Sequence, residues 1–195
     1  MTRKIRIVVV IGNPGAKSRT KVLAQAIATR LADGLAGHHA IQLQTLEIAQ
    51  LAPQLLASGW PAELPPEGAA AVHAIETADL VVAATPVHKG SYTGLFKHLF
   101  DLVAPEALVG RPVLLAANGG SDRHALVVDH QLRPLFAFFR ALTVPSAVYA
   151  AESDFEGYTI RSSALQARID EAVAQAVGLV LRGREEALIE HRQAA

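Results

Sequence analysis

The chain has 195 residues, with 18 Lys and Arg, 18 Asp and Glu, 51% hydrophobic residues and no Cys. This length predicts one domain over residues 1–195 and is too short for two domains of ordinary size. A formal net charge of zero leaves no overall positive field to hold nucleic acid or an anionic membrane, so any phosphate must be bound locally. The lack of Cys excludes disulfides, thiolate zinc sites and cysteine nucleophiles, and it fits a reducing compartment.

No export signal is expected at the N-terminus. Arg3, Lys4 and Arg6 surround an apolar run over residues 7–11, but the run is too short, and Gly12-Asn13-Pro14-Gly15 follows it in place of a cleavage site. No stretch approaches the ~20 apolar residues that a membrane-spanning helix needs. We therefore expect a cytoplasmic protein without a membrane segment.

The N-terminal part of the chain predicts two strands separated by a helix. Residues 5–11 are a continuous β-branched run, which is typical of a buried parallel strand. Ser18 can cap the helix that follows. Apolar residues then recur at i, i+4 and i+8 on one helix face: Leu23, Ile27 and Leu31. Alternating polarity over residues 41–46 predicts an edge strand.

The remainder of the chain alternates helices and strands. Residues 52–68 hold four prolines, two glycines and the only Trp, so we expect an irregular excursion with at most a short helix. Helices are expected over residues 69–78, 92–103 and 125–141, and from residue 163 onwards, with the charged stretch 182–192 extending the last one into solvent. Buried strands are expected over residues 80–85, 112–118 and 144–150.

This order of elements predicts an α/β fold. With right-handed crossovers it gives a doubly wound five-stranded parallel sheet, for which we choose the strand order 2-1-3-4-5. In such a sheet, ligands bind beyond the carboxyl ends of the strands, at the switch point between the first and third strands. Three loops of this sequence should meet there.

The first loop, residues 12–20, suits a terminal phosphate. It combines the flexible Gly12 with Ser18, Arg19 and Thr20 at the start of a helix, where backbone N–H groups and the helix dipole favour an anion. A capped helix start with solvated charges explains this loop equally well. The loop matches neither the P-loop pattern nor the G-x-G-x-x-G dinucleotide pattern.

The other two loops suit a planar ring. The second contains Pro86, Val87, His88, Lys89, Gly90 and Ser91. Its glycine would let the backbone approach a ring closely and its lysine could offset charge on a reduced ring, although a solvated lysine is the favoured reading. The third contains Asn118, Gly119, Gly120 and Ser121, where the glycine pair permits backbone N–H groups to face a ligand edge.

Metal and nucleophile chemistry are not expected. His124 and His130 are six positions apart and so face different sides of a helix, without the spacing of a metal-binding pair. Ser91 lacks the G-x-S-x-G context of an activated serine.

Three strings of this sequence resemble the NAD(P)H-dependent FMN reductase family, and specifically the reductases that serve two-component alkanesulfonate and methanesulfonate monooxygenases. They are Thr85-Pro86-Val87-His88-Lys89-Gly90-Ser91-Tyr92-Thr93-Gly94-Leu95-Phe96-Lys97, Gly119-Gly120-Ser121-Asp122-Arg123-His124-Ala125-Leu126 and Asp129-His130-Gln131-Leu132-Arg133-Pro134-Leu135-Phe136. The resemblance spans the chain from the first strand to the region of Phe155.

The resemblance implies a flavodoxin-like fold and FMN reduction by NADH or NADPH. It places the FMN phosphate on Ser18, Arg19 and Thr20, and the ring against residues 86–91 and 118–121. The family usually has Tyr where His88 stands and Thr where Asn118 stands, so the hydrogen bonding of the ring differs here. Hydride transfer is the chemistry of the two nucleotides, and we name no catalytic acid or base.

The resemblance also implies partners and assembly. We expect FMN to leave in reduced form for an FMNH2-dependent monooxygenase, and the chain to form a homotetramer. The family implies a π-bulge near residues 129–131 with His130 at the subunit interface. Independently, Phe136, Phe138 and Phe139 beside Leu132, Leu135 and Leu142 offer more apolar surface than one helix is expected to bury in its own domain.

Three other functions are compatible with parts of this sequence. A quinone or azo reductase with tightly bound FMN shares the fold, but its relatives usually have Pro-Glu-Tyr-Asn where Pro86-Val87-His88-Lys89 stands here. A flavodoxin-like electron carrier is usually acidic, whereas this chain has no net charge. A Rossmann dehydrogenase could use Glu47 as its ribose-binding acid, but the glycine fingerprint is missing.

Overall fold

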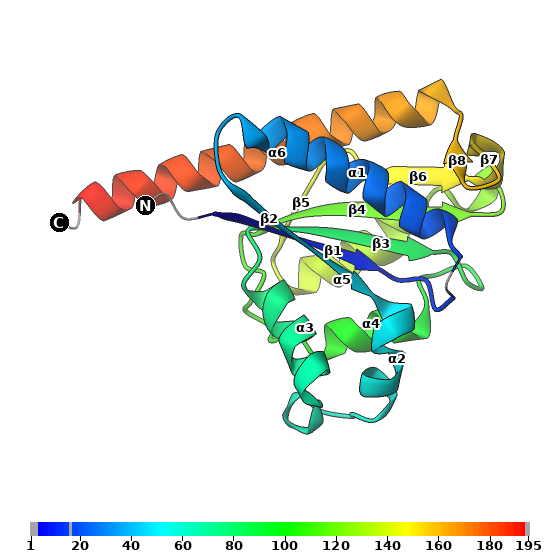
Figure 1. Cartoon of the computed structure of the whole chain (residues 1–195), viewed down its shortest axis with the longest axis horizontal. Coiled ribbons are helices and arrows are strands. Elements are labelled where there is room, and N and C mark those ends of the chain that lie inside the picture. The colour runs from blue at the N-terminus through cyan, green and yellow to red at the C-terminus, as the bar shows by residue number, and fades with distance from the viewer. Residues whose placement is uncertain (1–3, 16, 194–195) are drawn as a thin grey trace.

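The computed structural model describes residues 4–15 and 17–193, with side chains as far as residue 185. Its middle layer is a parallel sheet of order β2-β1-β3-β4-β5 (Figure 1), which confirms the predicted flavodoxin-like α/β fold and strand order. The strands are β1 (Ile5–Ile11), β2 (Ile41–Glu47), β3 (Leu80–Pro86), β4 (Pro112–Gly119), β5 (Leu142–Thr143) and β6 (Val148–Ala151).

The fifth position of the sheet is shared by two short strands, so the prediction of one strand over residues 144–150 is wrong. β5 pairs with the start of β4 and β6 with its end. Between them lies Pro145, which has no N–H to donate to the sheet. The neighbouring N–H of Ser146 instead donates to Oε1 of Gln175, at 2.8 Å, on the last helix.

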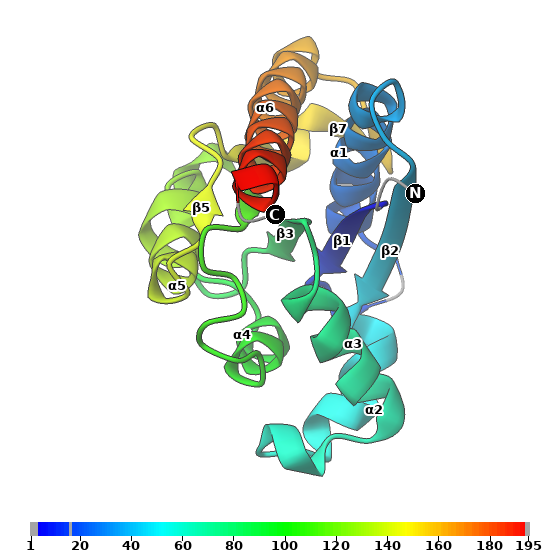
Figure 2. The same cartoon turned by 90° about the vertical axis from the view of Figure 1, so that its left-hand side faces the viewer.

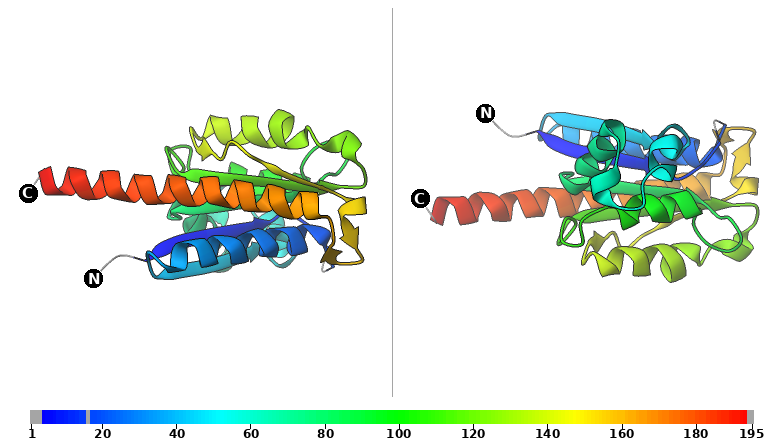
Figure 3. Two further views of the ribbon diagram at one scale, coloured as in Figure 1. Left: turned by 90° about the horizontal axis from the view of Figure 1, so that it is seen from above. Right: turned by 90° about the horizontal axis from the view of Figure 1, so that it is seen from below.

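Helices cover both faces of the sheet, as Figures 1 and 2 show. One face carries α1 (Arg19–Ala36) and α6 (Ser163–Gln193), which pack side by side. The other carries α2 (Ile48–Leu56), α3 (Pro66–Glu76), α4 (Gly94–Asp101) and α5 (Arg133–Phe138). The C-terminal part of α6 reaches past the sheet (Figure 3), as expected of the last helix. None of the described helices combines the length and apolar character of a membrane span.

The excursion after β2 holds more regular structure than predicted. α2 begins at Ile48 and continues through Pro53, a 3-10 helix covers Pro61–Glu63, and α3 begins at Pro66. The expectation of at most one short helix is therefore wrong. A proline is tolerated in the first turn of a helix because the N–H groups there have no partner within the helix, and Pro66 stands at such a position.

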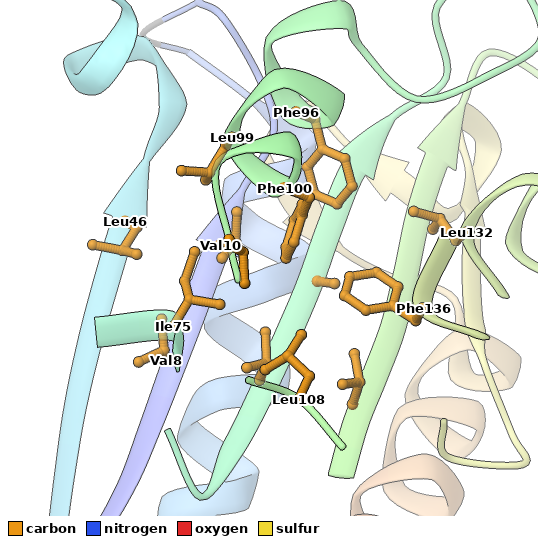
Figure 4. Packing of buried hydrophobic residues seen from close by; sticks show 14 of the residues in the cluster. Val8, Val10, Leu46, Ile75, Phe96, Leu99, Phe100, Leu108, Leu132 and Phe136 are labelled. Carbon is orange, nitrogen blue, oxygen red and sulfur yellow. The ribbon is translucent and has the colours of Figure 1, made fainter. Parts of the chain in front are cut away.

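Alternate residues of β1 supply the two cores. Ile7 and Val9 pack under α1 and α6, whereas Val8 and Val10 face the opposite cluster. The cluster that Val8 and Val10 face contains several aromatic rings (Figure 4), and those of Phe100 and Phe136 meet edge to face with centroids 4.9 Å apart.

This aromatic core changes the argument for assembly. Phe136 and Phe139 are 0% and 2% exposed and so are buried within their own subunit. Of the three clustered phenylalanines, only Phe138 remains exposed, at 68%. The exposed apolar surface near α5 is therefore smaller than the sequence predicted, because two of these rings pack against Phe100 of α4.

The helix expected over residues 125–141 is divided, and it contains the π-bulge that the resemblance implied. Val128–Leu132 form a π-helix, and the N–H of Arg133 donates to the carbonyl of Val128, five residues back. Pro134 follows within the first turn of α5. Because proline has no N–H, the α-helical hydrogen-bond ladder is interrupted at this point.

Candidate functional site

The carboxyl ends of β1, β3 and β4 bring the three predicted loops together. Gly12 follows β1 directly and is buried, and its N–H donates to the carbonyl of Ala84 at 2.7 Å. Its carbonyl accepts a hydrogen bond of 2.8 Å from the hydroxyl of Thr93. A Cβ at position 12 would stand 2.7 Å from the ring of Phe96, so the close approach of these loops requires glycine.

The start of α1 has free capacity for an anion. Ser18 is the N-cap, and its Oγ accepts a hydrogen bond of 3.2 Å from the N–H of Lys21. The N–H groups of Arg19 and Thr20, at the first two helical positions, have no partner within the helix. Together with the positive end of the helix dipole, these groups suit a phosphate.

Thr20 points inward rather than toward the loop. Its side chain is buried, with the residue 1% exposed, and its hydroxyl donates a hydrogen bond of 2.5 Å to Oδ1 of Asn118. This bond fixes the orientation of the Asn118 amide, whose Nδ2 group is then the donor available to a ligand. At position 20 the backbone N–H, and not the hydroxyl, is therefore the group placed for a phosphate.

Arg19 reaches a hairpin that the sequence did not predict. This hairpin consists of β7 (Phe155–Glu156) and β8 (Thr159–Ile160). One guanidinium nitrogen lies 2.9 Å from Oε1 of Glu152, just before the hairpin, and Nε donates to the carbonyl of Gly157 at 3.1 Å. The arginine expected to hold phosphate is thus already paired with a carboxylate.

The second loop forms a tight turn at the edge of the sheet. His88 and Ser91 exchange backbone hydrogen bonds of 2.8 and 3.1 Å. Between them, Lys89 and Gly90 have φ of 52° and 85°, the two positive values that define a type I′ turn. Ser91 also donates its hydroxyl to Oε1 of Gln131 in the π-helix, at 3.0 Å. The turn is therefore fixed at its base, while its tip is exposed.

The second and third loops are linked through Asn118. Its carbonyl accepts a hydrogen bond of 2.8 Å from the N–H of Val87, and its neighbour across the sheet is Pro86. With the Thr20 bond, Asn118 therefore connects all three loops.

Tyr149 shapes the third loop, and the sequence reading missed it. Its hydroxyl donates to the carbonyl of Ser121 at 2.6 Å, and a Cβ on Gly119 would lie 2.5 Å from that hydroxyl. Burial, followed by the negative charges of Asp122 and Asp154, raises the pKa of the Tyr149 hydroxyl above 10.0. Its position on β6, opposite the end of β4, is the one signal that could have identified it.

The loops leave open space for a planar ligand. Apart from each glycine and its two chain neighbours, no heavy atom of the described residues lies within 4 Å of a Cβ built on Gly90 or on Gly120. An open depression of about 220 Å³ lies between the tight turn and the segment that includes the π-helix, and of the predicted ring-binding residues Gly90 alone lines it. It is lined by Gly90, Arg123, His124, Leu126, Val127, His130 and Gln131.

The donor set at this edge matches the needs of FMN. A helix N-terminus with an arginine can hold a phosphate, and the backbone groups of two glycine-containing loops can bind the polar edge of a ring. Among the described residues, no three His, Asp or Glu side chains are grouped as metal ligands.

Comparison with known proteins identifies the family. The family described as NADPH-dependent FMN reductase matches residues 5–156. The NADH-dependent FMN reductase SfnF of Pseudomonas fluorescens is 50% identical over 179 residues, which cover 92% of this chain and 94% of that protein. The FMN reductase (NADPH) of Pseudomonas aeruginosa is 47% identical over 188 residues, covering 96% and 98%.

A solved structure agrees in fold. An oxidoreductase from Corynebacterium diphtheriae has a TM-score of 0.80 and 33% identity, covering 92% of this chain and 99% of its own. The resemblance noted in the sequence is thereby confirmed. The chain belongs to the NADPH-dependent FMN reductase family, and it is an oxidoreductase that uses FMN and a nicotinamide nucleotide.

Proposed function

We propose that this protein reduces free FMN and releases it to a separate FMNH2-dependent monooxygenase of the sulfonate type. The similarity to the Pseudomonas FMN reductases supports the first step. The motifs shared with reductases of two-component sulfonate monooxygenases support the second. Because NADH and NADPH are available in the cytoplasm, we also propose a cytoplasmic location.

The proposed FMN phosphate site is the start of α1. Ser18 would contribute its hydroxyl, Arg19 its guanidinium and N–H, and Thr20 its N–H. Gly12 supports this site from below by allowing the loops to approach one another. The N–H groups and the helix dipole attract the negatively charged phosphate, and Lys17 is the one further basic side chain of the loop.

The proposed ring site lies between the second and third loops. It includes residues of the tight turn and the end of β4: Pro86, Val87, His88, Lys89, Gly90, Ser91, Asn118, Gly119, Gly120 and Ser121. Nδ2 of Asn118 and the backbone N–H groups of the glycine pair would donate hydrogen bonds to the ring edge. When bound, FMN supplies the site that accepts hydride, and the residues of the chain orient the ring toward the nicotinamide.

One observation carries the proposal that FMN is released. The guanidinium of Arg19, which is the charged side chain of the phosphate site, is already engaged by Glu152 at 2.9 Å. These groups, namely a shared arginine, one hydroxyl and backbone donors, give the phosphate only a moderate binding affinity. Micromolar binding, about 8 kcal/mol, permits release within a catalytic cycle.

The test is steady-state oxidation of NADH and of NADPH with and without added FMN, oxygen being the acceptor. Purified protein should be largely colourless, and the rate should rise and saturate as FMN is added. A yellow preparation that keeps stoichiometric FMN through dialysis and needs a quinone or azo compound, but not added FMN, would instead identify the alternative reductase.

We also propose that the protein assembles as a homotetramer. Three exposed apolar side chains before, at the end of and after the segment formed by the π-helix and α5 support this: Leu126, Phe138 and Leu142 are 62%, 68% and 49% exposed. His130, exposed on the π-helix, is the residue proposed to contact a second subunit. Sedimentation at micromolar concentration tests this directly, since a monomer there contradicts it.

A further inference from the structure

Arg19 holds a carboxylate where the proposed function requires it to hold a phosphate. Its guanidinium lies 2.9 Å from Oε1 of Glu152, and its Nε donates to the carbonyl of Gly157 at 3.1 Å. The fork of donors on a guanidinium fits a carboxylate and a phosphate in the same way. The two anions would therefore compete for the same side chain.

The backbone at Glu152 is held firmly. Glu152 begins a 3-10 helix, Glu152–Asp154, in which Oδ2 of Asp154 accepts a hydrogen bond of 2.8 Å from the N–H of Ala151. Phe155, which follows, is 9% exposed and packs into the core beneath α1 and α6. The backbone of Glu152 is thus held close to Arg19.

The Glu152 side chain itself is free to move away. It is 59% exposed, against 34% for Arg19, so rotation into water costs little. The pairing is therefore readily exchanged for a stronger anion.

We propose that Glu152 is an internal competitor of the FMN phosphate, one that lowers the affinity for FMN and so hastens its release. This inference rests on the proposed function. A phosphate monoester carries a charge of about −1.5 to −2 at pH 7 and displaces the single charge of the carboxylate. The displaced Glu152 then remains close to the phosphate and repels it.

Riboflavin provides the internal reference, because it has the same ring and no phosphate. Its binding leaves the pair of Arg19 and Glu152 intact. Glu152 therefore determines how strongly the protein distinguishes FMN from riboflavin, and it does so without contacting the ring.

The experiment compares Glu152→Gln with the unaltered full-length chain in titrations of FMN and riboflavin, followed by flavin fluorescence without nicotinamide. FMN should bind about two- to fivefold more tightly to the variant, the range that exposed ion pairs span, and should dissociate more slowly by a similar factor in stopped flow. Riboflavin affinity should not change.

Glu156→Gln is the matched control. Glu156 lies in the hairpin that follows Glu152 and pairs with Arg161 at 2.9 Å, so the control removes the same charge without freeing Arg19. Its FMN affinity should equal that of the unaltered chain. In an Arg19→Ala background, Glu152→Gln should lose the part of its effect that comes from competition for the guanidinium and keep only the part that comes from direct repulsion of the phosphate.

The inference is overturned if Glu152→Gln leaves the FMN affinity unchanged or weakens it, if riboflavin responds equally, or if Glu156→Gln has the same effect. Failure of the proposed function looks different. In that case the unaltered chain itself would retain FMN through dialysis, whatever the ratio of the two flavin affinities in the variants.

Discussion

The hydroxyl of Thr20 donates a hydrogen bond of 2.5 Å to Oδ1 of Asn118, and so joins the start of α1 to the end of β4. The two residues are 98 positions apart in the sequence. The bond links the proposed phosphate site to the proposed ring site, because it decides which end of the Asn118 amide faces the ligand.

Replacing Thr20 by Val should therefore disturb the ring rather than the phosphate. The loss of the buried hydroxyl leaves Oδ1 of Asn118 without this donor, which should cost about 1–3 kcal/mol of unfolding free energy in urea. FMN and riboflavin should lose affinity by the same factor. Thr20→Ser retains the hydroxyl, so its unfolding free energy and its two flavin affinities should be close to those of the unaltered chain. A loss confined to FMN would show that Thr20 binds the phosphate through its side chain.

Gly119→Ala should destabilise the protein, because the new Cβ would lie 2.5 Å from Oη of Tyr149. Overpacking of this kind costs about 1–3 kcal/mol, measured by urea unfolding. The next nearest atom of that tyrosine, Cζ, is 3.5 Å away, an ordinary contact. In a Tyr149→Phe background the same substitution should therefore cost much less. Gly120→Ala, which meets none of the described residues within 4 Å, is the control and should be nearly neutral for stability.

Tyr149 also predicts a pH dependence of stability. Its pKa in the folded state is raised above 10.0, first by burial and then by Asp122 and Asp154. The folded protein therefore holds this proton more tightly than the unfolded chain does. The resulting stability is fully present below pH 10 and is lost as the pH rises through the folded pKa. The difference in unfolding free energy between the unaltered chain and Tyr149→Phe should shrink above pH 10, and a constant difference would contradict the shift.

The tight turn offers a test of backbone strain. Lys89 has a φ of 52°, which is costly for a residue with a side chain, and the following Gly90 has 85°. Asn tolerates this conformation better, so Lys89→Asn should raise the unfolding free energy by a few tenths of a kcal/mol. Gly90→Ala should lower it by about 1 kcal/mol. If Lys89→Asn lowers the unfolding free energy, or if Gly90→Ala leaves it unchanged, the turn does not have this conformation in solution.

Local patterns predicted the central sheet because buried parallel strands are continuous β-branched runs. β1, β3 and β4 stand close to where hydrophobicity placed them, and the loops that follow them meet as the topology requires. The split into β5 and β6 escaped this reasoning, although Pro145 marks the break. The pattern of apolar residues continues across the proline, whereas the backbone hydrogen bonds do not.

The contacts that define the site depend on tertiary structure, and local sequence does not encode them. Glu152 and Tyr149 lie far along the chain from Arg19 and Gly119, the residues they affect. Thr20 matched a phosphate-binding pattern, yet its side chain turns to Asn118 because that position on α1 faces the sheet. The π-helix was expected only through the family resemblance, since no periodicity of apolar residues reveals one extra residue in a helix.

Arg19 is the charged side chain proposed to hold the FMN phosphate. Arg19→Ala should weaken FMN binding by about 1.5 kcal/mol, because charge-assisted hydrogen bonds to the phosphate are lost. The value lies at the lower end of the usual range, since Glu152 already competes for the guanidinium. Riboflavin binding, measured by the same fluorescence titration, should be almost unchanged.

Arg161→Ala is the matched control for Arg19→Ala. It removes a guanidinium that also pairs with a glutamate, at 2.9 Å, in the same region, and that is 67% exposed. It should leave both flavin affinities within experimental error, because a solvated charge outside the site is screened by salt. If Arg19→Ala weakens FMN and riboflavin by the same factor, the arginine supports the fold of the loop and the phosphate is held elsewhere. If Arg161→Ala reproduces the loss of FMN alone, the phosphate responds to the general charge of the hairpin region and not to Arg19.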